Sequence, residues 1–140
     1  MIEMSTPENN KKVVLMLCRS VFQEHDFSKL DEIMRDDYIQ HNPDTPQGKA
    51  GFIQFFTEMF RAMPDFSYTV KEIIAEDNIV MMYSTTTATH LGEWLGNPPT
   101  GNKLEFDVVD IFRLDNGKIA EHWDVADTLK LFTQVGKVKL

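Results

Sequence analysis

One strand of a hairpin in the C-terminal part of the chain carries an acid in an apolar row, which strongly constrains the fold. The hairpin spans residues 104–127 and reads LEFDVVDIFRLDNGKIAEHWDVAD. Side chains of a strand alternate between its two faces, so Asp110 shares a face with apolar residues only. These residues are Leu104, Phe106, Val108, Phe112 and Leu114. An ionised carboxylate in such a row must be neutralised, paired or turned to a cavity, and the row therefore predicts a lined pocket.

The turn of this hairpin decides which residues of the return strand join that row. A three-residue loop over residues 115–117, closed by a left-handed glycine as a bulge, pairs Asp110 with His122 and Val108 with Asp124. On this register Asp110, His122 and Asp124 lie on one face of the sheet. We favour this register because the loop sequence fits the bulged turn.

A two-residue turn at Asn116-Gly117 is the alternative. It would place Trp123 opposite Asp110 and turn Asp124 to the other face, because a slip of one residue exchanges the faces of a strand. His122 would then point away from Asp110 as well. Both registers stay open at this point.

The composition describes one acidic globular domain over residues 1–140. A formal net charge of −8 disfavours binding to nucleic acid or to an anionic membrane surface. No apolar run approaches the roughly 20 residues of a transmembrane helix, and residues 1–12 lack the pattern of a signal peptide. Cys18 is the single cysteine and falls on an apolar helical stripe, which suits core packing in a reducing compartment. We expect a cytoplasmic protein.

The spacing of apolar residues changes from a helical period to a period of two near residue 66. Helices are predicted over residues 6–23, 28–34 and 49–62, with an extended segment over residues 38–43. Strands are predicted over residues 66–75 and 79–90, before a loop at 92–101 and the hairpin. This order is typical of the α+β class. We expect a cone-shaped curved sheet, antiparallel or mixed, with three N-terminal helices enclosing a cavity.

Several strings of the sequence resemble the SnoaL-like polyketide cyclase family. They are residues 90–101, 110–113 and 117–124, together with 38–43 and 131–136. The resemblance covers about residues 10–136 and implies the cone-shaped fold of the nuclear transport factor 2-like superfamily. It also implies a homodimer formed through the outer face of the sheet.

Characterised cyclases of this family close a polyketide ring by an intramolecular aldol reaction, without metal or cofactor, using an aspartate as acid and base. The resemblance places that aspartate at Asp124. Asp110 stands where these cyclases carry a histidine, so two carboxylates replace a histidine–aspartate pair. A pocket asparagine of the family falls within residues 40–42 without matching one position.

We therefore predict Asp124 and Asp110 as catalytic residues, with burial making Asp124 a better base. The alternatives are that Asp124 caps the segment from Val125 or pairs with an arginine, and that Asp110 is structural. His41 is the histidine most able to reach the cavity, whereas His90 fits either a cavity wall or the buried core. The predicted substrate-binding residues are His41, Asn42, His90, His122, Trp94, Trp123 and Phe112. The spacing holds no metal-ligand signature, so no metal site and no cofactor are predicted.

Two functions fit these observations. The first is a cofactor-free enzyme that enolises a small hydrophobic carbonyl compound, as an aldol cyclase or an isomerase does. The second is a non-catalytic module that binds a small apolar ligand, or another protein through its outer sheet face. That face includes Val109 and Ile111 between charged residues.

Overall fold

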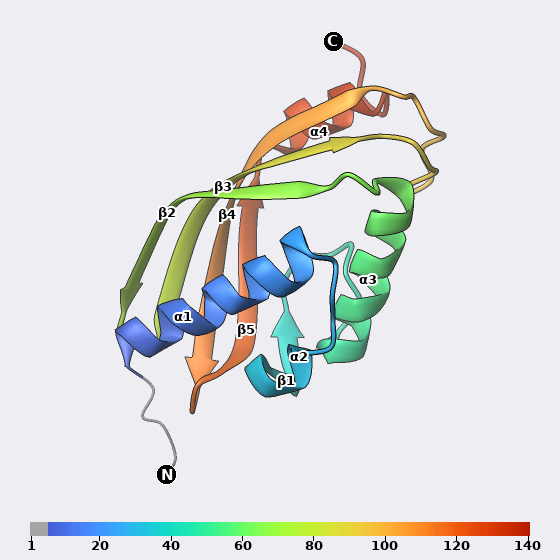
Figure 1. Ribbon diagram of the computed structural model, residues 1–140. Coiled ribbons are helices and arrows are strands. Elements are labelled where there is room, and N and C mark those ends of the chain that lie inside the picture. Colours follow the sequence, from blue (N-terminus) through green and yellow to red (C-terminus); the bar gives the residue numbers. More distant parts are fainter. Residues whose placement is uncertain (1–5) are drawn as a thin grey trace.

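Five strands form one mixed sheet in the computed structural model, which describes residues 6–140 (Figure 1). The strands lie in the order β1-β5-β4-β3-β2. Only β1 and β5 run parallel, and the other neighbours are antiparallel. The strand bounds are β1 Met34–Gln40, β2 Ser67–Glu76, β3 Ile79–Thr89, β4 Lys103–Asp115 and β5 Lys118–Ala126. Residues 1–5 of the segment examined for a signal peptide lie outside the described part.

The helices begin with α1, whose start follows from its first residues. Thr6 is in extended conformation and its hydroxyl accepts a hydrogen bond from Asn9 N, while Pro7 occupies the first helical position. A π-helix, η1, continues α1 to Gln23, so the predicted helix over residues 6–23 is confirmed in extent. The helical bounds are α1 Pro7–Leu17, η1 Cys18–Gln23, α2 Leu30–Ile33, α3 Gly48–Ala62 and α4 Thr128–Gln134.

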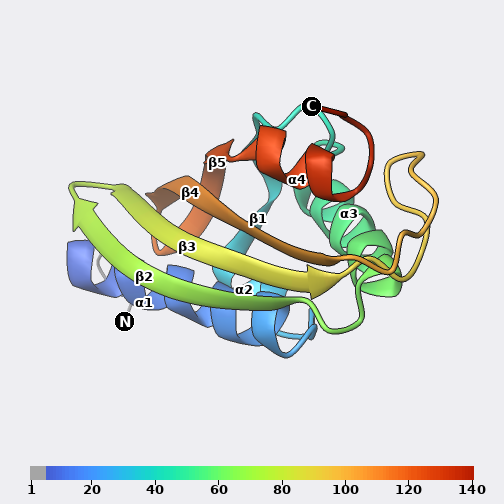
Figure 2. The same ribbon diagram turned by 90° about the horizontal axis from the view of Figure 1, so that it is seen from above.

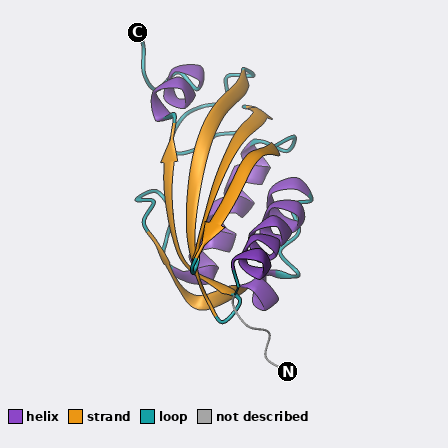
Figure 3. Cartoon of the chain, turned by 90° about the vertical axis from the view of Figure 1, so that its left-hand side faces the viewer, coloured by secondary structure: helices purple, strands orange, loops and turns teal. Residues whose placement is uncertain are grey.

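The sheet curls, and α1, α2 and α3 cover its concave side (Figures 2 and 3). The core lies between these two layers and includes fully buried residues from both, such as Leu17 and Val21 below and Met82 and Leu104 above. The predicted α+β fold with three helices on one side of a mixed sheet is confirmed. The sequence reasoning did not anticipate α4, which packs at the end of β4 and whose first turn is capped by Asp127.

The register of the β4–β5 hairpin differs from both registers considered above. The strands are joined by the two-residue turn, with Asn116 and Gly117 both at positive φ, 49° and 77°. This conformation is the type I′ turn that matches the twist of the flanking strands. The favoured three-residue loop is therefore wrong, because the left-handed pair Asn-Gly closes the hairpin without a bulge.

The bulge lies three residues further along, where Ala120 is an extra residue between the pairs Leu114–Ile119 and Arg113–Glu121. Without this extra residue, the two-residue turn would turn Asp124 away from the face of Asp110; with it, the two side chains share a face. Asp110 consequently pairs with Asp124, and not with His122 as predicted. The shared face of Asp110, His122 and Asp124 is nevertheless correct, because two shifts of one residue cancel in parity.

No helix among residues 6–140 is long and apolar enough to cross a membrane.

Replacing Gly117 by alanine tests the observed turn. No atom lies within 4 Å of a Cβ built at this position, so the cost arises from the positive φ alone. We expect the free energy of unfolding in urea to fall by about 1 kcal/mol. Gly117→Asn is the control and should cost less, since asparagine tolerates the left-handed region. Equal stability of the alanine variant and the parent would contradict the turn described here.

Candidate active site

A cavity of about 130 Å³ lies between the concave face of the sheet and the helices η1 and α3. Most of its wall is aromatic or aliphatic, and none of the described residues that line it is a lysine or an arginine. A space of this size holds roughly one aromatic ring. Its apolar lining includes Phe22, Phe52, Phe56, Phe66, Phe106 and Phe112.

Polar groups gather at one end of this cavity, where β4 and β5 pair. Asp110, His122 and Asp124 each bring one polar side-chain atom within 4.8 Å of the other two. All three residues line the cavity, as the shared face of the hairpin requires. The structure therefore brings together both predicted catalytic residues and one predicted substrate-binding residue.

Asp110 is 7% exposed and receives hydrogen bonds on both carboxylate oxygens. Its Oδ1 lies 2.8 Å from His122 Nε2, and its Oδ2 accepts a hydrogen bond from the Tyr68 hydroxyl. Burial, followed by the nearby charge of Asp110, raises the pKa of Tyr68 well above its ordinary value. Tyr68 therefore stays protonated and acts as a donor to Asp110.

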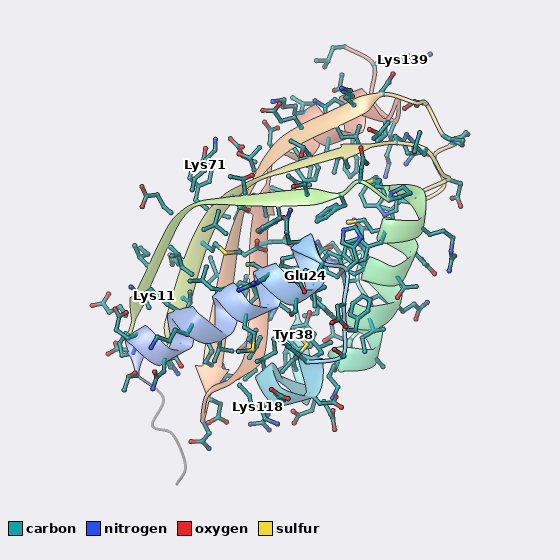
Figure 4. All side chains as sticks on the ribbon, in the orientation of Figure 1. Lys11, Glu24, Tyr38, Lys71, Lys118 and Lys139 are labelled. Carbon is teal, nitrogen blue, oxygen red and sulfur yellow. The ribbon has the colours of Figure 1, made fainter. Side chains whose placement is uncertain are left out.

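His122 is held on its other side by Gln40 of β1. Its Nδ1 lies 2.8 Å from Gln40 Oε1, which also accepts the backbone N–H of Asn42 at 3.0 Å. That backbone donor fixes the orientation of the Gln40 amide, because a flipped amide would bring two donors together. Gln40 Nε2 in turn donates to the hydroxyl of Tyr38, which lies inside the molecule between helices and sheet (Figure 4). His122 therefore carries a proton on Nδ1.

Asp124 is half-buried and is held by a single side chain. Asn42 Nδ2 donates to Asp124 Oδ2 at 3.0 Å, while Asn42 Oδ1 accepts the backbone N–H of Asp44 at 2.9 Å. The second bond orients the Asn42 amide so that its NH₂ faces Asp124. No hydrogen bond from the described residues reaches the other oxygen, Oδ1. Asp124, which lines the cavity, thus has one anchored oxygen and one without a hydrogen bond to the described residues.

Two predicted aromatic residues also line the cavity. Phe112 is buried, and its ring lies 4.9 Å from that of His122. Trp94 belongs to the loop before β4 and is buried, whereas the neighbouring Leu95 is 38% exposed. Partly exposed lining residues mark the side on which the cavity meets solvent. They include Leu95, Phe55 of α3, and Thr128 and Phe132 of α4.

The structure places His41 and Trp123 on the outer face of the sheet, away from the cavity. Trp123 pairs with Ile111 across β4 and β5, opposite in parity to His122. The imidazole of His41 stacks on Trp123 at 4.8 Å and binds Glu121 Oε2 at 2.7 Å. The prediction that His41 is the histidine most able to reach the cavity is therefore wrong. Pairing of β1 with β5 sends Gln40 inward and His41 outward.

His90 is fully buried but does not line the cavity. Its backbone bonds Gly101 and Asn102, and its Nδ1 lies 3.0 Å from Thr100 Oγ1. These bonds join the two ends of the loop over residues 92–101. Of the two alternatives considered for His90, the structure favours the buried core residue.

Sequence reasoning missed Tyr68 and assigned no separate role to Gln40. The signal for Tyr68 was present, since it lies between Phe66 and Val70 on the inner face of β2, as Asp110 lies among apolar residues on β4. A buried hydroxyl among apolar residues requires a hydrogen-bond partner, as a buried carboxylate does. Gln40 could not be found without knowing that β1 pairs with β5.

The polar groups at this end of the cavity do not fit a metal ion well. His122 Nδ1 is a hydrogen-bond donor, and its Nε2 and both oxygens of Asp110 are engaged with one another or with Tyr68. A cation would have to displace these bonds. Of the oxygens and ring nitrogens of Asp110, His122 and Asp124, only Asp124 Oδ1 has no hydrogen bond to the residues that the structure describes. The arrangement is instead suited to moving protons between groups that already share hydrogen bonds.

Comparisons with known proteins agree with this geometry. The pattern of the family described as SnoaL-like polyketide cyclase matches residues 12–135. Aklanonic acid methyl ester cyclase DauD of Streptomyces sp. (strain C5) is 27% identical over 77% of this chain and 67% of its own length. The corresponding cyclase DnrD of Streptomyces peucetius is 24% identical over 86% of this chain and 89% of its own length.

Solved structures show the same fold. TsrD from Streptomyces laurentii superposes with a TM-score of 0.87 at 24% identity, over 97% of this chain and 100% of that chain. AclR from Streptomyces galilaeus gives a TM-score of 0.83 at 29% identity, over 96% of this chain and 100% of that chain. The expected cone-shaped fold is thus confirmed by similarity as well as by topology.

Replacing Glu121 by glutamine tests the outward placement of His41. Hydrogen bonds from Arg113 and His41 lower the pKa of Glu121, so its stabilising effect is present above the unfolded pKa of about 4.3. We expect the variant to lose about 0.5 to 1 kcal/mol of unfolding free energy at neutral pH. The loss should shrink as pH falls through the lowered folded pKa. Urea titrations at several pH values measure it, with exposed Glu105→Gln as control; a pH-independent difference would contradict the ion pairs.

Proposed function

Since this chain belongs to the SnoaL-like polyketide cyclase family, we propose that it is a cofactor-free enzyme that enolises a hydrophobic carbonyl compound. The cyclase relatives support a cyclase function in general. The observation that best supports enolisation is the hydrogen bonding of Asp124. One of its oxygens is anchored by Asn42, the other has no hydrogen bond to the described residues, and the residue lines an apolar cavity beside the Asp110–His122 pair.

Asp124 acts as the general base in this proposal. Its unengaged Oδ1 takes the proton from the carbon next to the ligand's carbonyl group, and the Asn42 amide keeps the carboxylate in position. An apolar wall strengthens a carboxylate base because it removes the water that would otherwise solvate the anion. Asp127, and not Asp124, accepts the capping hydrogen bond at the start of α4, the helix that follows β5.

The Asp110–His122 pair acts as the acid of the same reaction. One exchangeable proton lies between Asp110 Oδ1 and His122 Nε2, next to the position where charge develops on the ligand oxygen. In an aldol cyclisation the enolate carbon forms a bond to a second carbonyl carbon of the same molecule. The new alkoxide takes a proton from the Asp110–His122 pair. Protonated Asp124 then passes the proton that it abstracted to this pair, so both groups return to their starting states and protons balance over the cycle.

The cavity suits a neutral ligand with a ring at its inner end. A free carboxylate would meet Asp110 and Asp124 without any lysine or arginine among the described lining residues. The two cyclase relatives are named for a methyl ester, in which the carboxyl charge is masked. We infer a polyketide-like ketone, one ring of which occupies the cavity while the rest extends between Leu95 and Phe132.

The outer face of the sheet is proposed as the surface of a homodimer. A row of side chains crosses β2 to β5 on this face at paired positions, namely Ile74, Met81, Ile111 and Trp123. Ile74 is 63% exposed, and Val125, two residues after Trp123 on β5, is 68% exposed. An apolar surface of this kind is typical of an interface.

A charge on this face should break the dimer. We expect Val125→Glu to shift the mass measured by light scattering from dimer to monomer, because an unpaired carboxylate would be buried on association. Lys139→Glu is the control, since Lys139 lies beyond α4 at the C-terminal end of the chain and outside the sheet (Figure 4). A parent protein that is already monomeric would contradict the proposed dimer.

Loss of the base should abolish the chemistry and spare binding. With a panel of cyclic and polyketide-like ketones in D₂O, NMR reports the exchange of hydrogen next to the carbonyl group. We expect Asp124→Asn to slow the exchange about 10²- to 10⁴-fold, with ligand affinity nearly unchanged. Asp127→Asn is the matched control, because asparagine also caps a helix. Normal exchange by the Asp124 variant would favour the binding-module function.

A further inference from the structure

Tyr68 reaches the reacting groups from a distant strand. It lies on β2, and β3 separates it from β4, which carries Asp110. The curl of the sheet still brings the Tyr68 hydroxyl onto Asp110 Oδ2. No catalytic role was assigned to Tyr68 above, although it lines the same cavity.

The π-helix η1 contacts both the backbone and the ring of Tyr68 and so fixes its position. Gln23 Oε1 accepts the backbone N–H of Tyr68 at 3.1 Å, and the ring of Phe22 packs on the tyrosine ring at 4.9 Å. π-Helices are rare and often mark functional positions, because their wider turn re-aims side chains. Here the wide turn supplies both contacts, and the hydroxyl has little freedom to leave Asp110.

The hydrogen bonds restrict where the exchangeable protons can be. His122 Nδ1 must carry a proton, because Gln40 Oε1 faces it as an acceptor. A single proton is left between His122 Nε2 and Asp110 Oδ1. Its place on one side or the other decides whether His122 is a cation or Asp110 is a neutral acid.

We propose that Tyr68 is a positioning residue that keeps this proton on His122. By donating to Oδ2, Tyr68 stabilises Asp110 as the anion, and the site then holds an imidazolium donor beside the base Asp124. This inference rests on the proposed function for its catalytic consequence only. The placement of the proton is a property of the protein without ligand.

The other groups that face Asp110 support this charge arrangement. Burial raises the pKa of Cys18 in η1 and of Tyr38 in β1, so both stay neutral. The side chains that α3 turns to the cavity are phenylalanines and Met59, without charge. Asp124 is the second carboxyl group near His122, with one polar atom of each within 4.8 Å of the other.

Nitrogen NMR of the histidine rings tests the proposal on the ¹⁵N-labelled protein at neutral pH. The His122 resonances are assigned by their loss in His122→Gln. We expect both ring nitrogens of His122 to be protonated in the parent protein. In Tyr68→Phe, Nε2 should shift towards the value of an unprotonated nitrogen, as the proton moves to Asp110. Tyr83→Phe removes a comparable hydrogen bond, to Asp107 on the outer face, and should change nothing.

An unprotonated Nε2 in the parent would overturn the proposal, and so would identical His122 resonances in the parent and Tyr68→Phe. Should Tyr68→Phe not fold, Gln23→Ala loosens the tyrosine from an exposed position and should move Nε2 in the same direction; no movement would overturn the proposal. Where ketone exchange is observed, Tyr68→Phe should lower kcat about tenfold with KM nearly unchanged. Absence of exchange in the parent would refute the proposed function while the resonances still decide the role of Tyr68.

Discussion

The carboxylate of Asp110 lies in an apolar row at the end of a cavity, where an ion without partners would not be stable. Its two oxygens are engaged by Tyr68 from β2 and His122 from β5, and His122 is engaged in turn by Gln40 from β1. Satisfying this one carboxylate therefore requires four of the five strands. The sheet must curl to bring Tyr68 across β3, and β1 must pair with β5 to supply Gln40. The cone shape and the polar end of the cavity are consequences of the same requirement.

The site derives its chemical character from the contrast between this end and the rest of the cavity. Most of the wall is aromatic, which lowers the local dielectric and strengthens each electrostatic interaction inside. Within the network, Asp110 and His122 are fully engaged, whereas Asp124 keeps one oxygen open. The hydrogen-bonded Asp110–His122 pair can act as the acid, and Asp124, with one oxygen free of hydrogen bonds to the described residues, can act as the base beside it. This separation of acid from base is what proton abstraction and return demand of one site.

Much of this arrangement could be predicted from the sequence, because periodicity determines faces. Asp110, His122 and Asp124 share a face as predicted, yet the pairing was wrong, since the turn and the bulge at Ala120 shifted the register by two residues together. A shift of two residues leaves each side chain on the same face of the sheet but gives it a different partner on the neighbouring strand. His41 could not be placed, because its face depends on how β1 pairs with β5, which no local pattern encodes. The face of Trp123 follows instead from the β4–β5 register, which turns it away from the face of His122. Tyr68 carried a readable signal, a hydroxyl among apolar residues, but its partner lies two strands away.

Acid–base catalysis by Asp124 predicts one arrangement that can be seen directly. Crystals of the protein grown with cyclic and polyketide-like ketones should show a ring in the cavity, with the carbon next to the carbonyl group within about 3.5 Å of Asp124 Oδ1. The carbonyl oxygen should face the Asp110–His122 pair. A ligand that fills the cavity without a polar atom near Asp124 or Asp110 would contradict acid–base catalysis at this site. It would make the protein a carrier of apolar molecules on the same fold.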